Sequence, residues 1–417
     1  MVHTPCLPQP VYHRYRRREP SMPAGHAPSL TPEEARALHR QSLVIDTQQP
    51  PITSGIVFTP GMRETLGALA AQGRTIAEVG PALEAALVRD IQTTEQGRDM
   101  YLDMWRRSGV TVACGTYAGP DRLATAFERS TRRIANAQAI VDALRDDMLI
   151  VRRAADIELA HTEGRHGVII DFQNTLALGD DLDRIDLFYG LGLRMVQLTY
   201  NLHTLVGDGC TDRYQGGLTY FGQEMVRRLN AAKIIVDVSH CSEQIGWDAM
   251  AISTAPVIVS HSSSKAVAEH DRGKSDELAR AVAEQGGYFG VVTLPGFIRE
   301  TPGASLDDVV RQISHLVDIC GIDHVGIGTD KAGPGPGTSS QVEYPTSMRP
   351  QLAGEFNWMG FRVEDHRIGN EYQLAGYESL ADWPNITVAL AQAGFTEDEL
   401  RKLLGLNYLR VFREIVG

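Results

Sequence analysis

The sequence predicts an α/β protein folded as a (β/α)8 barrel, and two observations support this prediction. After residue 40, short runs rich in Val, Ile and Leu alternate with longer amphipathic segments. Near-continuous apolar runs are typical of strands buried on both faces, as in a parallel sheet with helices outside it. Eight strand–helix repeats over about 300 residues also fit a closed barrel. A doubly wound open sheet is the alternative, although no GxGxxG motif follows the first run to support a dinucleotide site.

The apolar runs themselves are the predicted strands. They cover residues 43–47, 110–117, 166–172, 194–200, 234–240, 256–261, 288–295 and 324–330. Long insertions follow the first and the last strand. Residues 48–109 contain a helical stretch at 81–106, and residues 331–378 are rich in Gly, Pro and aromatic residues. The second insertion is expected at the carboxyl-terminal face of the barrel, where barrel active sites form.

Three of the intervening segments carry clear helix signals. In residues 219–232, apolar side chains recur at i, i+4 and i+8 and share one face of a helix. Residues 305–319 and 396–405 each open on a capping box, a Ser or Thr followed three residues later by an acid. Gly405 is predicted to end the last of these helices.

The N-terminal part of the chain differs from the rest. It is rich in Pro and Arg and shows little hydrophobic periodicity. Residues 1–40 are therefore predicted to form a loosely ordered arm, and residues 41–417 a single barrel domain.

Composition restricts the partners and the compartment. The 417 residues include 52 acidic residues and 40 Lys or Arg, a net charge of −12, which argues against nucleic acid or an anionic membrane as the main partner. The 5 cysteines are widely spaced and include no CxxC pair, which favours free thiols in a reducing compartment. No apolar stretch reaches the ~18 residues of a membrane helix, and no signal peptide is recognisable. We therefore expect a cytoplasmic protein.

Polar residues stand at the ends of four predicted strands. They are Asp171, His240, His261 and Asp330. Taken alone, such a residue is more often a hydrogen-bonding group than a ligand. In a barrel, however, all four point into one mouth, where two imidazoles and two carboxylates suit a divalent metal such as zinc. A metal there would activate water for hydrolysis, and Asp330 could take up the proton.

Several stretches, in order along the chain, form a characteristic set: VQLTYNLHTLVGDGC (196–210), GLTYFGQEMVRRLN (217–230), IIVDVSHCS (234–242), PVIVSHSS (256–263), RGKSDE (272–277), HVGIGTD (324–330) and NYLRVF (407–412). Together they resemble the renal or membrane dipeptidase family, peptidase family M19, of the amidohydrolase superfamily. The resemblance runs from about residue 43 to the C-terminus and implies a barrel that hydrolyses dipeptides with two zinc ions in its mouth.

The resemblance also implies roles for individual residues. His240 and His261 match the pair that holds the second metal, and Asp330 matches the strand-eight aspartate. Arg272 matches the arginine that binds the substrate carboxylate, a task that suits a guanidinium fork. Asp171 falls where the family has its bridging glutamate and is one methylene shorter.

The sequence departs from the family at the first strand. Gln48 and Pro50 stand where the family has a metal-binding His and Asp. An amide is a poor zinc ligand and proline has no side-chain donor, so we expect at most one tightly bound zinc ion. Tyr200 stands where mammalian members have a His that steadies the tetrahedral intermediate, and a phenol can still donate one hydrogen bond to an oxyanion.

These observations predict a dipeptidase-like metallohydrolase that cleaves an amide bond in a small dipeptide-like or amino-acid-derived substrate. The candidate metal ligands are Asp171, His240, His261 and Asp330. The candidate catalytic residues are Asp330, Tyr200 and Asp171, and the candidate substrate-binding residues are Arg272, Tyr200, His203 and Gln48.

Two other functions stay open. The same pocket could carry out a non-hydrolytic biosynthetic step of tautomerase or lyase type, with Asp330, Tyr200 and His203 as proton carriers. The protein could also be an inactive binding homologue, although the retained imidazoles disfavour this. The resemblance further suggests a homodimer.

Overall fold

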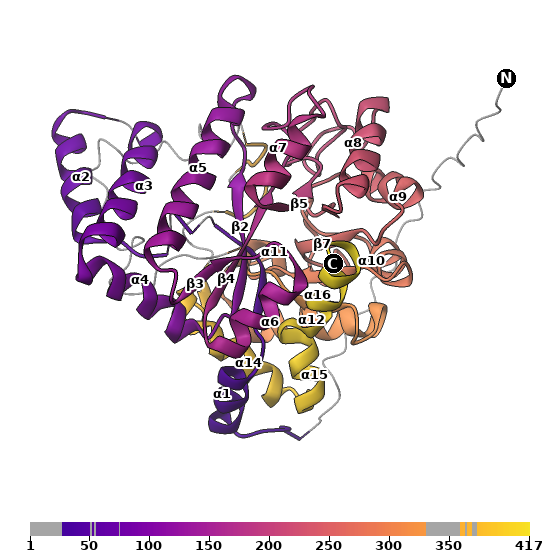
Figure 1. Cartoon of the computed structure of the whole chain (residues 1–417). Coiled ribbons are helices and arrows are strands. Elements are labelled where there is room, and N and C mark those ends of the chain that lie inside the picture. The colour runs from indigo at the N-terminus through magenta and orange to yellow at the C-terminus, as the bar shows by residue number, and fades with distance from the viewer. Residues whose placement is uncertain are drawn as a thin grey trace.

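The computed structural model describes residues 27–417 except 51, 54–55, 75, 331–358, 363–364 and 369–372. Parallel strands form a central barrel, and helices surround it (Figure 1). The barrel strands are β1 (Ile45–Gln49), β2 (Val112–Ala118), β4 (His166–Phe172), β5 (Leu193–Gln197), β6 (Ile235–Asp237), β7 (Ile258–Ser262), β8 (Tyr288–Val291) and β10 (Val325–Ile327). They are hydrogen-bonded in that order, and each lies within or overlaps one predicted strand. The predicted α/β barrel is therefore confirmed.

The barrel closes along the line where β1 meets β10, which we call the seam. The backbone N–H of Asp330 donates to the Gln48 carbonyl at 2.9 Å. The backbone N–H of Thr329 donates to the Asp46 carboxylate at 2.8 Å. Hydrogen bonds beyond the end of β10 thus join the last strand to the first.

The sheet contains one strand that the sequence did not indicate. Strand β3 (Met148–Ile150) pairs with the first half of β4, outside the path of the barrel strands. Three residues are too few to show a periodicity, so the pattern could not predict it. In addition, β6 ends at Asp237 and β10 at Ile327, earlier than expected, so His240 and Asp330 lie in the loops that follow these strands.

Helices cover the outside of the barrel. They are α1 (Pro32–Gln41), α2 (Pro60–Ala71), α3 (Ile76–Thr93), α4 (Glu95–Ser108), α5 (Leu123–Ala143), α6 (Ala154–Glu163), α7 (Arg184–Leu191), α8 (Tyr220–Ala231), α9 (Glu243–Ile252), α10 (Asp276–Glu284), α11 (Pro295–Ile298), α12 (Leu306–Cys320), α14 (Trp383–Gln392), α15 (Glu397–Arg401) and α16 (Asn407–Ile415). The helices predicted at 219–232 and 305–319 are confirmed as α8 and α12, and α12 begins with the predicted capping box at Ser305. Among the described helices, none combines the length and the apolar character needed to cross a membrane.

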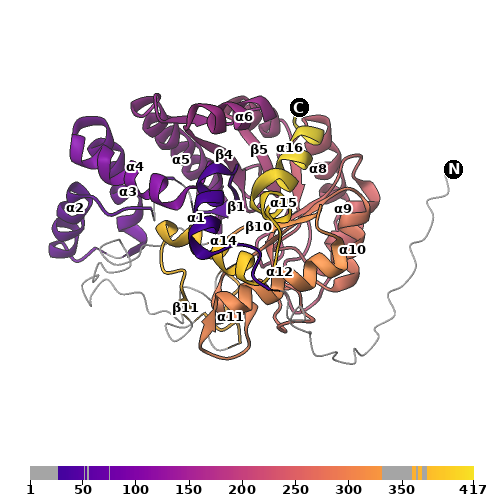
Figure 2. The same ribbon diagram turned by 90° about the horizontal axis from the view of Figure 1, so that it is seen from below.

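Two predictions near the chain ends were wrong. The last part of the predicted arm, residues 1–40, is helix α1, which begins with a capping box at Thr31 and lies beside α14 (Figure 2). Buried Ala35 and Leu38 provide its packing face, whereas residues 1–26 lie outside the described part. Gly405 does not end a helix, because a one-turn π-helix, η4 (Lys402–Leu406), joins α15 to α16. A Cβ at Gly405 would lie 2.5 Å from the Leu43 carbonyl, so the glycine allows close packing there instead.

The two predicted insertions differ in how much is described. The first contains α2, α3 and α4, and the helical stretch predicted at 81–106 is divided between α3 and α4. Most of the second, residues 331–378, lies outside the described residues. Its described end includes β11 (Leu374–Ala375), which pairs with β9 (Ala304–Ser305).

Alternation along the strands separates the barrel interior from the helix-covered face. Val168 and Ile170 of β4 belong to the core under the helices, whereas Ile169 belongs to a second cluster with Tyr408 of α16. Asp171 has the same parity as Ile169, so its side chain points into the barrel. Asp237 of β6 follows the interior residue Ile235 in the same way. The carboxyl-terminal end of the interior is therefore polar.

Candidate active site

The centre of the candidate site is a pair of imidazoles. His240 lies in the turn after β6, and His261 lies in β7, where the register against β8 shifts between Val259 and Ser262. Both side chains are buried. Their Nε2 atoms are 3.0 Å apart. The structure thus brings together the two histidines that the sequence predicted as neighbours.

Hydrogen bonds on the far side of each ring fix the protonation of the pair. The Nδ1 atom of His240 lies 2.7 Å from Oδ1 of Asn201, an atom that can only accept, so Nδ1 carries the proton. The Nδ1 atom of His261 lies 2.7 Å from Oγ of Ser260, whose own proton goes to Asp237 at 2.6 Å. Both Nε2 atoms therefore present lone pairs to each other.

A cation bound to both Nε2 atoms would stabilise the two lone pairs that face each other. Burial lowers the pKa of both imidazoles well below the usual value, and the Arg272 charge lowers it further, so the rings are neutral. Tetrahedral zinc with nitrogen ligands at about 2.0–2.1 Å would hold them about 3.3 Å apart. The observed 3.0 Å needs only a small opening. This part of the donor set therefore fits one metal ion.

The carboxylates do not complete a ligand cluster. Among the described residues, no three His, Cys, Asp or Glu side chains lie in position to hold a metal ion together. The grouping of Asp171 and Asp330 with the two imidazoles around one ion therefore stays a prediction. Asp171 Oδ2 is buried and has no hydrogen-bond partner among the described residues. Burial raises the pKa of Asp171 well above its usual value, and Asp237 and Asp330 raise it further.

Asp330 lies beyond β10 with a left-handed backbone, φ 54°. Burial raises the pKa of Asp330 to about 7, with Arg272 lowering it and Asp46 raising it. A carboxyl group that titrates near neutral pH can both accept and return a proton. This property supports the proton-carrying role predicted for Asp330.

Tyr200 and Asn201 approach the imidazole pair from the loop after β5. The Tyr200 ring stacks on His240 with ring centroids 4.1 Å apart. Asn201, at φ 56°, orients His240 through its side-chain oxygen. Sequence reasoning missed Asn201, and the available signal was weak: Asn is a residue that tolerates the left-handed conformation.

Arg272 is fully buried beside the pair. Its Nη1 donates to the Ser239 carbonyl, and its Nη2 donates to the His261 carbonyl at 2.8 Å. Nε has no partner among the described residues. The guanidinium therefore supports the backbone beside both imidazoles, and Nε–H, which has no partner among the described residues, is available to a substrate carboxylate.

The first-strand residues do not form a metal site. The Gln48 amide nitrogen donates to Thr116 and to the Gln49 carbonyl, and its Oε1 is buried without a partner in the described structure. Pro50 offers no side-chain donor. Gln48 does lie near Asp171, because Thr116 is the register partner of Asp171. These residues do not fit a first metal ion.

His203 is not brought into the cluster. Its side chain is 64% exposed, and its Nδ1 is paired with Asp208. Among the described residues, no hydrogen bond or ring contact joins His203 to the imidazole pair. Its role in binding substrate stays a prediction.

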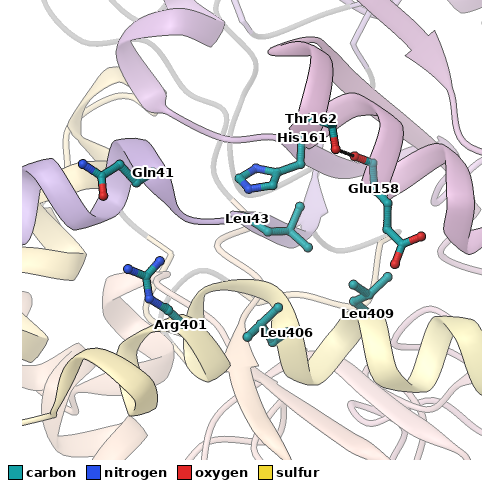
Figure 3. A pocket seen from close by; sticks show the side chains of 8 residues that line it. All are labelled: Gln41, Leu43, Glu158, His161, Thr162, Arg401, Leu406 and Leu409. Atoms are coloured by element: carbon teal, nitrogen blue, oxygen red, sulfur yellow. Dashed lines mark hydrogen bonds between the residues drawn. The ribbon is translucent and has the colours of Figure 1, made fainter.

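A separate cavity has a volume of about 450 Å³, and Figure 3 shows the side chains that line it. It is lined by Gln41, Leu43, Glu158, His161, Thr162, Arg401, Leu406 and Leu409. Leu43 precedes β1, and His161 lies in α6, which leads into the start of β4. The cavity thus lies at the amino-terminal ends of the strands and shares no residue with the imidazole site.

Comparisons with known proteins agree with this architecture. Residues 75–349, more than half of the chain, match the model of the membrane dipeptidase family, peptidase family M19. Dipeptidase tcpJ of Claviceps purpurea is 27% identical over 281 residues, which are 67% of this chain and 58% of that protein. This chain therefore spans less than two thirds of that relative's length.

Solved structures share the fold over nearly the whole chain. An amidohydrolase from Pseudomonas aeruginosa has a TM-score of 0.68 and 27% identity, covering 93% of this chain and 100% of that one. The probable dipeptidase PvdM from the same organism has a TM-score of 0.68 and 20% identity, covering 92% and 98%. The chain belongs to the membrane dipeptidase family of metal-dependent hydrolases, peptidase family M19, as its motifs predicted.

Proposed function

We propose that this protein cleaves an amide bond in a small dipeptide-like substrate and uses one tightly bound divalent metal ion. The observation that carries the proposal is the pair of buried imidazoles whose Nε2 lone pairs face each other at 3.0 Å. The name of the Claviceps relative, a dipeptidase, supports the substrate class.

His240 and His261 supply two ligands, and Asp171 is the proposed third. When bound, the ion would act as a Lewis acid on the scissile carbonyl and on the attacking water. Asn201 and Ser260 accept the Nδ1 protons of the two rings, which leaves both Nε2 lone pairs free to bind the ion. Asp171 Oδ2 is buried without a partner among the described residues, so a cation there would relieve an unfavourable state.

Asp330 carries the proton in this proposal. With a pKa raised by burial to about 7, it is partly ionised at neutral pH. It accepts a proton from the attacking water and returns it to the leaving amine, as general acid–base catalysis requires.

Arg272 and Tyr200 position the substrate. The buried guanidinium has no carboxylate within salt-bridge distance among the described residues, so its charge favours an anionic group such as a C-terminal carboxylate. Tyr200 lies flat on His240, and its hydroxyl is the proposed donor to the oxyanion.

A non-hydrolytic reaction on the same site is the second candidate, and the first-strand residues favour it. Gln48 and Pro50 remove the ligands of a first metal, and two-metal clamping assists amide cleavage. A tautomerase or lyase step would need only proton transfer, which Asp330 and Tyr200 could supply.

The experiment is a turnover assay of the zinc-loaded protein with a panel of dipeptides. We expect release of free amino acids by the wild-type protein, loss of release in His261→Ala, and unchanged release in His161→Ala, a control at the opposite end of the barrel. Metal binding without any release would favour the second candidate. Activity retained in His261→Ala would contradict the site.

Other expectations stay predictions. Cys114, Cys210, Cys241 and Cys320 are buried free thiols, which supports a reducing compartment, and we propose a cytoplasmic location. We also propose a homodimer and a single barrel domain.

A further inference from the structure

The turn at residues 238–241, which carries His240, lacks the backbone partners that a strand would have. Strand β6 ends at Asp237, so the carbonyls of the turn need other donors. The Val238 carbonyl accepts from the Cys241 N–H at 3.2 Å, and the His240 carbonyl accepts from the Cys210 N–H at 2.8 Å. The carbonyls on either side of His240, those of residues 239 and 241, are left to side chains.

Two buried cations of one loop supply those donors. Nη1 of Arg272 donates to the Ser239 carbonyl, and Nζ of Lys274 donates to the Cys241 carbonyl at 2.6 Å. The exposed fraction of the side chain is 0% for Arg272 and 1% for Lys274. The residues before and after His240 are therefore both fixed, because their carbonyls accept hydrogen bonds from Arg272 and Lys274.

The loop that carries the cations is itself fixed to the barrel. The Lys274 N–H donates to the Ser263 carbonyl at 2.8 Å, and the Lys265 N–H donates to the Lys274 carbonyl at 3.0 Å. Ser263 directly follows β7, the strand of His261. Arg272 also donates to the His261 carbonyl. One rigid segment thus sets the relative position of both imidazoles.

A contribution to folding stability does not by itself explain why Lys274 is buried. Among the described residues, its ammonium has no carboxylate within salt-bridge distance and donates to one carbonyl, that of Cys241. A buried cation with so little compensation costs more than an apolar side chain of similar size. Burial accordingly lowers the pKa of Lys274. A group retained at such a cost is expected to have a functional role.

We propose that Lys274 is a positioning residue that holds the turn of His240 so that its Nε2 meets the Nε2 of His261 at metal-binding distance. The proposal deepens the proposed function and rests on it, because it presumes that the imidazole pair binds a metal ion. Without the ammonium, the Cys241 carbonyl loses its donor, and the turn can relax away from His261.

The test compares Lys274→Met and Lys274→Arg with the wild-type protein, using Zn²⁺ in competition with a chromophoric chelator. Loss of an outer-shell partner typically weakens metal affinity by about 10–100-fold, and we expect that range for Lys274→Met. Lys274→Arg keeps a charged donor and should recover most of the affinity. Lys402→Met makes the same substitution at a lysine paired with Asp323 on the surface, and its affinity should stay unchanged.

The visible spectrum of Co²⁺ in the same proteins adds a readout that a purely structural role would not move, because it reports the ligand geometry. We expect an altered spectrum in folded Lys274→Met and a near-native one in Lys274→Arg. Should Lys274→Met not fold, Lys274→Gln takes its place with the same expectation, because its side chain is shorter than that of lysine and leaves the amide short of the Cys241 carbonyl. Native Zn²⁺ affinity and a native Co²⁺ spectrum in the folded variant would overturn the inference alone. A wild-type protein that binds neither ion would instead overturn the proposed function.

Discussion

Two buried carboxylates of the same barrel, Asp46 and Asp171, have opposite surroundings. Asp46 lies at the seam and accepts hydrogen bonds from the Thr329 N–H at 2.8 Å, the Thr329 hydroxyl at 2.7 Å, Gln49 at 2.9 Å and the Trp383 indole at 3.0 Å. Asp171 lies at the mouth, and its Oδ2 meets no donor among the described residues.

The difference separates a structural acid from a functional one. A buried charge that is fully hydrogen-bonded holds elements together, as Asp46 does for β1, the segment after β10 and helix α14. A buried acceptor without a donor costs free energy and is retained where a ligand completes it. Burial raises the pKa of both groups, so the hydrogen-bond partners, and not burial, distinguish them.

The largest expected effect is on stability at the seam. In Asp46→Asn, an amide nitrogen replaces one carboxylate oxygen. Its N–H groups would then face N–H and O–H donors that the carboxylate of Asp46 accepts from. We expect a loss of about 4 kcal/mol in the free energy of unfolding, the size typical of breaking a buried charged network. Urea denaturation measures it. A loss below about 1 kcal/mol would show that Asp46 contributes no more to stability than we expect of Asp171 at the mouth.

The pH dependence of the free energy of unfolding tests the buried His39 of helix α1, which packs beside α14. Burial lowers the pKa of His39 to about 4, with the bond to the Ser108 carbonyl raising it and Arg40 and Arg36 lowering it. The unfolded chain, with an ordinary value near 6.5, binds more protons between pH 6.5 and pH 4, so His39 should lower stability by about 3 kcal/mol as the pH falls through that window. In His39→Asn that part of the slope should vanish. Parallel curves for the two proteins would contradict the assignment.

Asp171→Asn should affect activity more than stability, the reverse of what we expect for Asp46→Asn. Replacing a buried acid whose Oδ2 has no donor among the described residues should change the free energy of unfolding by less than about 1 kcal/mol. Loss of a proposed ligand should lower kcat/KM for dipeptide hydrolysis by at least about 100-fold, more than an outer-shell change. Assaying turnover and urea denaturation on the same preparation gives both values. An active variant would exclude Asp171 from the site.

The smallest effect is expected at His203. Because its ring is largely exposed and paired with Asp208, we expect His203→Ala to change kcat/KM by less than about twofold. A steady-state comparison with the wild-type protein is sufficient. A large loss would show that this loop approaches the mouth when substrate is bound.

The sequence predicted the fold well, because buried parallel strands leave strong continuous apolar runs. It also predicted that His240 and His261 meet, since His240 follows β6 and His261 lies near the end of the adjacent strand β7. It could not predict how far each strand extends. A strand end depends on which carbonyls find partners, and Asp237 ends β6 because the next residues form a turn held by Arg272 and Lys274.

The supporting residues were also beyond prediction. Asn201 and Lys274 act through hydrogen bonds between segments distant in sequence, and Ser260 is oriented toward His261 by Asp237 of the neighbouring strand; no local pattern reports such contacts. Asp46 was not identified because an acid within an apolar run has the same appearance whether it serves the seam or the mouth. Only its partners, Thr329 and Trp383, assign its role.

The most direct test of the account is a calorimetric titration of the metal-free protein with Zn²⁺. We predict one tight equivalent per chain in the wild-type protein and none in the His240→Ala and His261→Ala double variant. Two tight equivalents, or binding retained by the double variant, would show that the ion is held elsewhere and that the facing imidazoles are not the metal site.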